Sequence, residues 1–128
     1  MPRTILVVDD DPQVRKLCRT ALEASGYSVK EAADGKVALA TVKQKTVDLI
    51  LLDLCMPDTD GIEILKALRS ELPQLRVITM SGFMGGVMLP AARHLGVAAS
   101  IAKPFSPDSL VSLVDEVLAK AAPAKASD

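Results

Sequence analysis

Apolar residues along the chain gather in short continuous runs that alternate with longer segments of mixed apolar and polar positions. Continuous apolar runs are typical of strands that are buried on both faces of a sheet. The strong runs lie at residues 5–8, 47–52, 77–80 and 97–102, and a weaker alternating run lies at residues 27–32. The pattern therefore predicts a sheet whose strands are separated by other elements.

The segments between the runs have helical periodicity, most clearly at the two ends of the chain. Asp11 and Pro12 suit the N-cap and the first turn of a helix, and Ser106 and Pro107 repeat this arrangement near the C-terminus. The positions expected to face the core are Val14, Leu17, Cys18, Ala21 and Leu22 in the first helix and Leu110, Leu113, Val114, Val117 and Leu118 in the last.

The middle of the chain predicts shorter helices. One begins near Gly35 and another at Gly61, after a turn at Asp60. Glycine and proline discourage a helix interior, so the fourth helix is expected to begin near Pro90 and to leave residues 83–89 as a mobile loop. The positions expected to face inward are Val37, Ala38, Thr41 and Val42 in the second helix and Ile62, Leu65 and Leu68 in the third.

Strict alternation of buried strands with helices predicts an α/β fold. The expected architecture is a doubly wound, five-stranded parallel sheet with helices on both faces, joined by right-handed crossovers. Residues 1–120 are expected to form one domain, and residues 121–128, rich in Ala, Lys and Pro, a flexible tail or the stub of a linker. In such sheets the ligand crevice lies beyond the carboxyl ends of the strands.

Composition narrows the classes of partner. The formal net charge is -1, with both signs scattered, which argues against sequence-independent binding of nucleic acid or of an anionic membrane. Only 2% of the residues are aromatic, too few for a base-stacking platform. The first apolar run is too short for a signal peptide or a membrane span, so we expect a cytoplasmic protein. Cys18 and Cys55 lack metal-binding spacing and predict two buried thiols in a reducing compartment.

Polar residues follow the predicted strands. Asp9 and Asp10 come after the first, Asp53 after the third, Ser81 after the fourth and Lys103 after the fifth. Close carboxylates repel one another unless a cation lies among them, and hard oxygen ligands favour magnesium. A phosphoryl group arriving at Asp53 would meet the metal, the Lys103 ammonium and the Ser81 hydroxyl, which together neutralise its charge.

Other polar residues have structural interpretations. Asp11 is expected to be an N-cap rather than a ligand. Asp58, Asp60 and Gly61 weakly resemble a calcium loop but lack its acid spacing and closing glutamate. His94 is expected at a surface helix position without a catalytic role.

Four motifs follow one another along the chain: ILVVDDDP at residues 5–12, LLDLCMPDTDG at 51–61, VITMSG at 77–82 and KPF at 103–105. Together they resemble the receiver domain of two-component response regulators, a CheY-like family, and the resemblance spans residues 3–120. The resemblance implies a strand order of 2-1-3-4-5. It also implies that the protein is a switch, which catalyses only its own phosphorylation and dephosphorylation.

The resemblance further implies the roles of the site residues. Asp53 would carry a phosphoaspartate formed from the phosphohistidine of a sensor histidine kinase or a histidine phosphotransfer protein. Asp10, Asp53 and the backbone carbonyl of Cys55 would hold magnesium (or manganese), with Asp9 acting largely through water. Ser81 and Lys103 would contact the phosphoryl group. The output would go to a downstream protein effector rather than to nucleic acid or a membrane, from a monomer or a phosphorylation-dependent dimer.

The chain departs from the family pattern at three positions. Ser100 stands where the family usually has an aromatic residue that turns inward on activation, so we expect the signal to travel by backbone displacement. Cys55 and Phe83 flank the path of the attacking water in the family, and neither orients water well. We therefore expect a long-lived phosphoaspartate.

Two alternatives remain open from the sequence. The chain could be the regulatory receiver cut from a longer hybrid kinase or transcription factor. It could also be a haloacid-dehalogenase-like phosphatase or a flavodoxin-like cofactor binder on the same fold. The phosphatase would need a second aspartate where Cys55 stands, and the flavodoxin a phosphate-binding loop where Asp9 and Asp10 stand.

Overall fold

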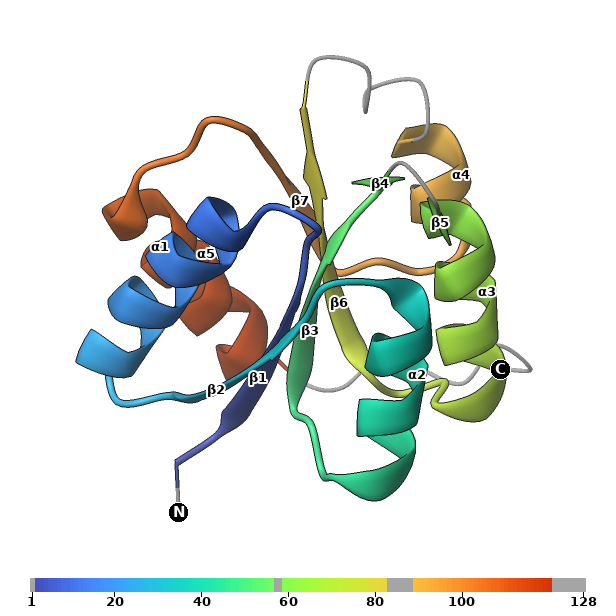
Figure 1. Ribbon diagram of the computed structural model, residues 1–128, viewed down its shortest axis with the longest axis horizontal. Helices are drawn as coiled ribbons and strands as arrows, with labels where there is room; N and C mark the ends of the chain where they lie inside the picture. Colours follow the sequence, from blue (N-terminus) through green and yellow to red (C-terminus); the bar gives the residue numbers. More distant parts are fainter. Residues whose placement is uncertain (1, 57–58, 83–88, 121–128) are drawn as a thin grey trace.

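A computed structural model describes residues 2–56, 59–82 and 89–120 of the chain. Its main sheet contains five parallel strands, shown in Figure 1, in the order β2-β1-β3-β6-β7. These strands are β1 (Thr4–Val8), β2 (Ser28–Ala32), β3 (Leu49–Asp53), β6 (Arg76–Ser81) and β7 (Ala99–Ala102). Counted along the chain, the five strands have the order 2-1-3-4-5, so the expected doubly wound sheet is confirmed.

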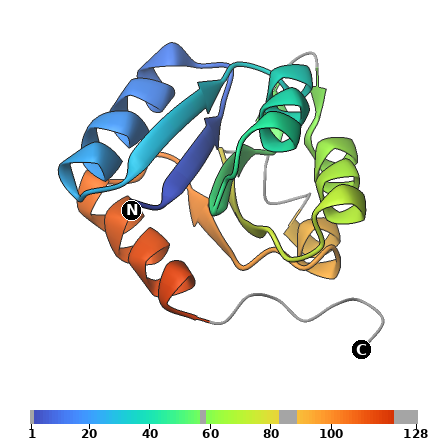
Figure 2. The ribbon, with the colours of Figure 1, turned by 90° about the horizontal axis from the view of Figure 1, so that it is seen from below.

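Helices cover both faces of the sheet (Figure 2). On one face lie α1 (Pro12–Ala24) and α5 (Pro107–Ala119), and on the other lie α2 (Gly35–Gln44), α3 (Gly61–Glu71) and α4 (Leu89–His94). None of the helices among the described residues is long and apolar enough to cross a membrane.

The helix caps follow from short polar side chains. The Asp11 carboxylate accepts a hydrogen bond from the Gln13 amide at 2.8 Å, and the Ser106 hydroxyl accepts one from the Ser109 amide at 3.0 Å. Both caps were predicted and are confirmed. The N-cap of α2 is Asp34, which accepts from the Val37 amide at 2.9 Å.

The sheet separates two apolar cores. Alternate residues of each central strand face opposite sides, so β1 and β3 contribute to both cores. The core under α1 and α5 contains Ile5, Val7, Cys18, Leu22, Val29, Leu49, Leu51, Ile78, Met80, Leu110, Val114, Val117 and Leu118. The core under α2, α3 and α4 contains Leu6, Val8, Ala32, Ala38, Val42, Ile50, Leu52, Leu54, Met56, Leu65, Leu68, Leu75, Val77 and Ala92.

Three predicted core positions are wrong. Leu17 on α1 is 36% exposed, although its neighbour Cys18 is fully buried. Val37 is 45% exposed, because α2 turns Gly35, Ala38 and Val42 toward the core and Val37, next to Ala38, toward solvent. Cys55 is exposed, although Cys18 is buried as expected. Cys55 belongs to the short strand β4 (Cys55–Met56), and the extended backbone turns it away from the core that Met56 enters.

Some boundaries differ from the prediction. The third and fifth strands begin at Leu49 and Ala99, two residues later than the apolar runs. Asp60, predicted as a turn, belongs to β5 (Thr59–Asp60), which pairs antiparallel with β4. The fourth helix begins at Leu89, next to the predicted Pro90. The predicted mobile loop lies largely outside the described residues, as do Asp58, Phe83 and the tail at residues 121–128.

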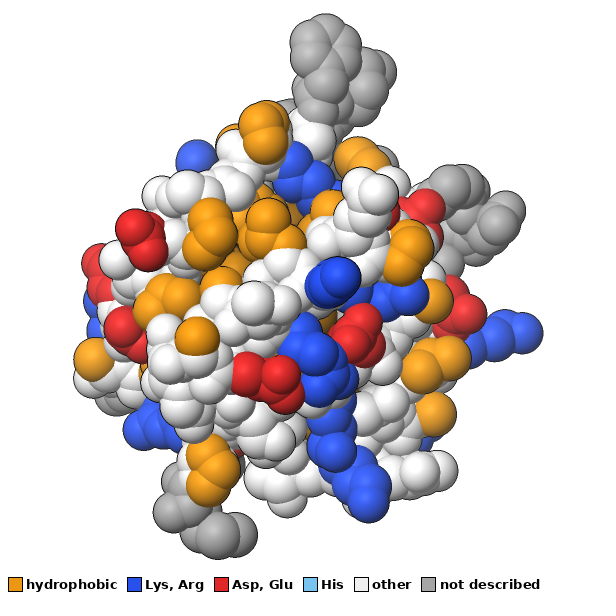
Figure 3. All heavy atoms as spheres, turned by 60° about the vertical axis from the view of Figure 1, so that its left-hand side comes forward, with side chains coloured by type: hydrophobic (Ala, Val, Ile, Leu, Met, Phe, Trp, Pro, Cys, Tyr) orange, Lys and Arg blue, Asp and Glu red, His pale blue; other side chains and the backbone are white. Residues whose placement is uncertain are grey.

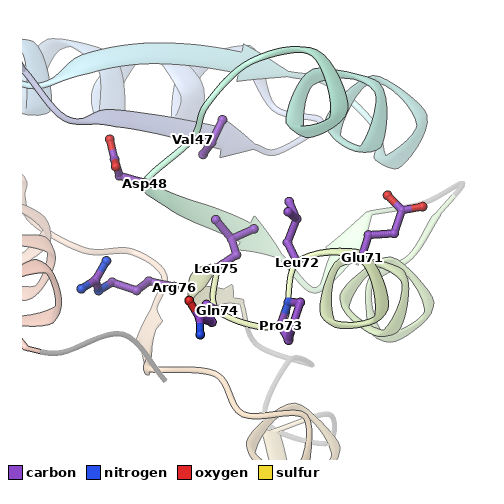
Figure 4. A pocket seen from close by; sticks show the side chains of 8 residues that line it. All are labelled: Val47, Asp48, Glu71, Leu72, Pro73, Gln74, Leu75 and Arg76. Carbon is purple, nitrogen blue, oxygen red and sulfur yellow. The ribbon is translucent and has the colours of Figure 1, made fainter. Parts of the chain in front are cut away.

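A groove of about 580 Å³ lies at the amino-terminal ends of β3 and β6 (Figure 4). The residues lining it are Val47, Asp48, Glu71, Leu72, Pro73, Gln74, Leu75 and Arg76. It lies at the opposite end of the sheet from the strand-end acids, so it plays no part in the site described next.

Candidate functional site

Three carboxylates meet at the carboxyl ends of β1 and β3. Val8 pairs with Leu52 across the two strands, so Asp9 and Asp53, the next residues of each, lie side by side. One oxygen from each of Asp9, Asp10 and Asp53 lies within 4.8 Å of the others. Asp9 and Asp53 are buried and Asp10 is exposed. The predicted acidic cluster is therefore present, with one side open to solvent.

Lys103 connects the two buried acids. Its ammonium lies 2.6 Å from Asp9 Oδ2 and 3.3 Å from Asp53 Oδ2. The peptide bond between Lys103 and Pro104 is cis. Lys103 is thus an ion-pair partner inside the site rather than a solvated surface residue.

Ser81 reaches the same edge at the end of β6. Met80 pairs with Asp53 and Ser81 pairs with Ala102, and the Lys103 amide donates to the Ser81 carbonyl at 2.7 Å. Ser81 is 6% exposed. The structure therefore brings all five predicted side chains to one edge of the sheet.

The charge state of the site follows from burial and from its one ammonium. Burial raises the pKa of Asp53, and the charge of Asp9 adds to this, although the Cys55 amide and Lys103 act in the opposite direction. The Cys55 amide donates to Asp53 Oδ1 at 3.0 Å. Burial alone would lower the pKa of Lys103, but its hydrogen bond to Asp9 and the charge of Asp53 outweigh that effect and raise it.

These residues fit a hard divalent cation. Three carboxylates against one ammonium leave a formal charge of about -2 at the cluster, which a divalent ion balances. Carboxylate oxygens are the ligands that magnesium prefers, and the exposed side at Asp10 leaves room for the water that magnesium retains.

Residues outside this cluster have structural roles. Asp11 caps α1, and its own amide donates to Asp9 Oδ1 at 2.9 Å. His94 is exposed on α4, as expected for a surface position.

Sequence reasoning missed Arg15. Its guanidinium donates to the Asp9 carbonyl at 2.7 Å, and nothing in the local pattern distinguishes it from other charged residues of α1. Its position one helical turn after the Asp11 cap is the only signal that could have indicated the contact.

A family model describing the response regulator receiver domain matches residues 5–115. The chain belongs to the response regulator receiver family. Members of this family typically hold Mg²⁺ at an acidic pocket, in line with the cluster of Asp9, Asp10 and Asp53. Membership of this family argues against both alternatives on the same fold, the haloacid-dehalogenase-like phosphatase and the flavodoxin-like cofactor binder.

Individual relatives differ in length. The chain is 36% identical to sporulation initiation phosphotransferase F of Bacillus subtilis, over 92% of this chain and 95% of that protein. It is 38% identical to the transcriptional regulatory protein ResD of the same species, over 91% of this chain but only 48% of that protein. The chain thus spans nearly all of one relative and about half of another.

A solved structure has the same fold. The CheY-like response regulator receiver domain protein of Methanospirillum hungatei superposes with a TM-score of 0.88 at 29% identity, over 93% of this chain and 95% of that chain.

Proposed function

We propose that this receiver domain is a phosphoacceptor switch of a two-component phosphorelay, in which Asp53 accepts a phosphoryl group. The observation that carries the proposal is the position of the Lys103 ammonium between Asp9 and Asp53 at the acidic cluster. A held carboxylate beside a cation is suited to attack a phosphoryl group, because the cation neutralises the charge on the group's oxygens. The donor is a sensor histidine kinase or a histidine phosphotransfer protein.

The transfer is a single displacement at phosphorus. A carboxylate oxygen of Asp53 forms the new bond, while the bond between phosphorus and the partner's imidazole nitrogen breaks and the nitrogen keeps the electron pair. The Cys55 amide holds Asp53 Oδ1 and so fixes the carboxylate plane. Lys103 and the Ser81 hydroxyl then bind the oxygens of the transferred group.

The acidic cluster is proposed to hold magnesium (or manganese). The ligands would be Asp10, Asp53 and the backbone carbonyl of Cys55, with Asp9 acting largely through water. When bound, the cation neutralises charge on the phosphoryl oxygens. The acidic side chains of the cluster would hold the positive charge of the cation next to Asp53.

The output is proposed to be a shift between two conformations at the ends of β6 and β7. The Lys103 amide binds the Ser81 carbonyl, so a movement of Ser81 toward the phosphoryl group displaces the end of β7. Ser100 on β7 carries no aromatic ring that could turn inward. A protein effector would therefore recognise the displaced backbone itself. Unchanged amide exchange over residues 81–94 upon adding a phosphoryl mimic would contradict this route.

An apolar hollow beside Lys103 supports a protein as the phosphoryl donor. The hollow, of about 280 Å³, is lined by Val14, Leu17, Lys103, Pro104 and Phe105. Figure 3 shows apolar side chains gathered around a hollow on the side of α1 and α5. Leu17 is 36% exposed there, which suits contact with an apolar partner surface.

Acetyl phosphate and Mg²⁺ test the proposal directly. We expect the wild-type protein to gain the mass of one phosphoryl group and Asp53→Asn to gain none. Asp11→Asn is the matched control. Asp11 directly follows Asp10 but caps α1, and asparagine also suits an N-cap, so this variant should still be labelled. Wild-type protein that stays unlabelled, or label that persists in Asp53→Asn, would refute the assignment.

The lifetime of the phosphoaspartate is a separate part of the proposal. Cys55 is exposed two residues after Asp53 but carries no carboxylate or amide that could orient water, so slow hydrolysis is expected. Phe83→Glu should accelerate hydrolysis, and an unaltered rate would count against this interpretation.

The wider assignments rest on the same proposal. The domain would cover residues 1–120 with a tail or linker stub at 121–128, act in the cytoplasm as a monomer or a phosphorylation-dependent dimer, and catalyse no reaction other than its own phosphorylation and dephosphorylation. Because relatives such as ResD are about twice as long, a receiver within a longer regulator is the second candidate. Reading the gene beyond Asp128 distinguishes the two.

A further inference from the structure

Arg15 binds the main chain of the acidic cluster rather than a carboxylate. It lies in the first turns of α1, its side chain is 17% exposed, and its Nη1 donates to the Asp9 carbonyl oxygen at 2.7 Å. A charged donor on a carbonyl makes a stronger hydrogen bond than a neutral one. The contact therefore restrains the backbone between β1 and α1.

The restrained group belongs to the peptide unit that joins Asp9 to Asp10. The Asp9 carbonyl and the Asp10 N–Cα bond lie in the same peptide plane. Holding the Asp9 oxygen therefore restrains the direction in which the Asp10 side chain leaves the backbone. The Asp9 side chain has partners of its own, the Asp11 amide and Lys103. Among the described residues, the Asp10 carboxylate has no hydrogen bond or ion pair that would orient it.

Arg15 is itself held from the neighbouring strand. Its Nε lies 3.1 Å from Glu31 Oε1 on β2, and the second oxygen of Glu31 lies 2.6 Å from Arg19 Nε. The hydrogen bond from Arg19 lowers the pKa of Glu31, so this carboxylate stays charged at neutral pH. A planar guanidinium held at Nε presents its remaining donors in a fixed direction, which a flexible ammonium does not.

We infer that Arg15 is a positioning residue for the cation site: pinned by Glu31, it fixes the Asp9–Asp10 peptide plane and so aims the Asp10 carboxylate at the cation. The inference rests on the proposed function, in which the acidic cluster holds a divalent cation. Arg15 acts through Asp10 and touches neither the cation nor the phosphoryl group.

The test measures Mn²⁺ binding to the unphosphorylated protein by electron paramagnetic resonance, alongside urea unfolding in the presence of a chelator. Arg15→Met should weaken Mn²⁺ binding about tenfold, the usual scale for residues that orient ligands. Arg19→Met is the matched control, because Arg19 shares Glu31 but donates to side chains of Glu31 and Glu23 rather than to Asp9. It should change Mn²⁺ affinity less than about twofold.

Arg15→Lys keeps the positive charge without the fork and provides the measurement if Arg15→Met does not fold. The Mn²⁺ affinity of Arg15→Lys should lie between those of the wild type and Arg15→Met. If Arg15→Met does not fold, the affinity of Arg15→Lys should still lie clearly below that of the wild type. Equal Mn²⁺ affinity in wild type and Arg15 variants, or equal weakening in Arg19→Met, would overturn the positioning role alone. A wild-type protein that binds no Mn²⁺ would overturn the proposed cation site and this inference together.

Discussion

The two faces of the sheet are covered in different ways. On one face α1 and α5 are long helices that pack against each other over a continuous apolar core. On the other face α2, α3 and α4 are shorter, and α4 has only 6 residues. Consequently Ser100, which β7 directs to this second face, stays exposed although its neighbour Thr79 on β6 is fully buried.

Hydrogen bonds from one arginine supplement apolar packing on the second face. Arg69 on α3 donates to the carbonyls of Pro73, Leu75, Leu95 and Gly96, and so connects α3 to the residues just after α4 and just before β6. Both faces therefore bury an apolar core, and the second face adds the charged hydrogen bonds of the Arg69 guanidinium where α3 meets the residues after α4.

The largest expected effect comes from removing this guanidinium. Arg69→Met leaves four carbonyls without their charged donor, so we expect the free energy of unfolding to fall by about 4 kcal/mol, measured by urea denaturation. Arg93→Met, at an exposed position of α4, is the control and should change it by less than about 0.5 kcal/mol. Similar results for both variants would show that other contacts hold the second face.

The next effect tests apolar burial on the first face. Leu22 is fully buried between α1 and the sheet, so Leu22→Ala should lower the free energy of unfolding by about 3 kcal/mol. Leu17→Ala on the same helix removes a partly exposed side chain and should cost less than about 1 kcal/mol. If the two variants unfold at the same urea concentration, burial under α1 is not the main source of stability on this face.

A smaller effect is expected at the uncovered edge of the second face. The hydroxyls of Thr79 and Ser100 lie 2.6 Å apart, and Ser100→Ala removes that partner from a buried threonine. We expect a loss of about 1 kcal/mol in unfolding free energy, because a buried hydroxyl then lacks this hydrogen bond. In a cycle with Thr79→Val, the double variant should lose less than the sum of the single ones, and additive losses would mean that the two hydroxyls do not interact.

The smallest effect concerns the ion pairs at the edge of the first face. The folded state lowers the pKa of Glu31 below its ordinary value of 4.5, chiefly through Arg19, so Glu31 contributes stability above that pH and loses it as the pH falls through the folded pKa. Glu31→Gln should therefore cost about 0.5 kcal/mol at neutral pH and progressively less in acid. Urea unfolding of both proteins across this pH range provides the measurement, and a difference that grows in acid would contradict the sign.

Much of the fold and of the candidate site could be predicted because both depend on local pattern and a general rule. Apolar runs located the five strands of the main sheet, and the polar residues after them were placed together by the rule that parallel strands end at one edge. The caps at Asp11 and Ser106 could be predicted because an N-cap bonds an amide only two or three residues away.

The errors arise where a side chain's environment depends on distant residues. Val37 and Cys55 are apolar enough for a core, but the faces occupied by Ala38 and Met56 turn them outward. Burial thus depends on which of two neighbouring side chains faces the sheet, and residue type alone does not specify which one does.

The sequence by itself determined the alternation of strands and helices and the set of polar residues at the strand ends, since both rest on periodicity and on contacts within a few residues. Only the tertiary structure decided that Lys103 bonds Asp9 and that Arg69 on α3 binds the Leu95 carbonyl after α4. It also decided that Arg15 reaches from α1 to the Asp9 carbonyl while Glu31 on β2 holds its guanidinium. The physical reason is that hydrogen bonds need atoms within about 3 Å, and for residues distant in sequence only the packed sheet provides that proximity.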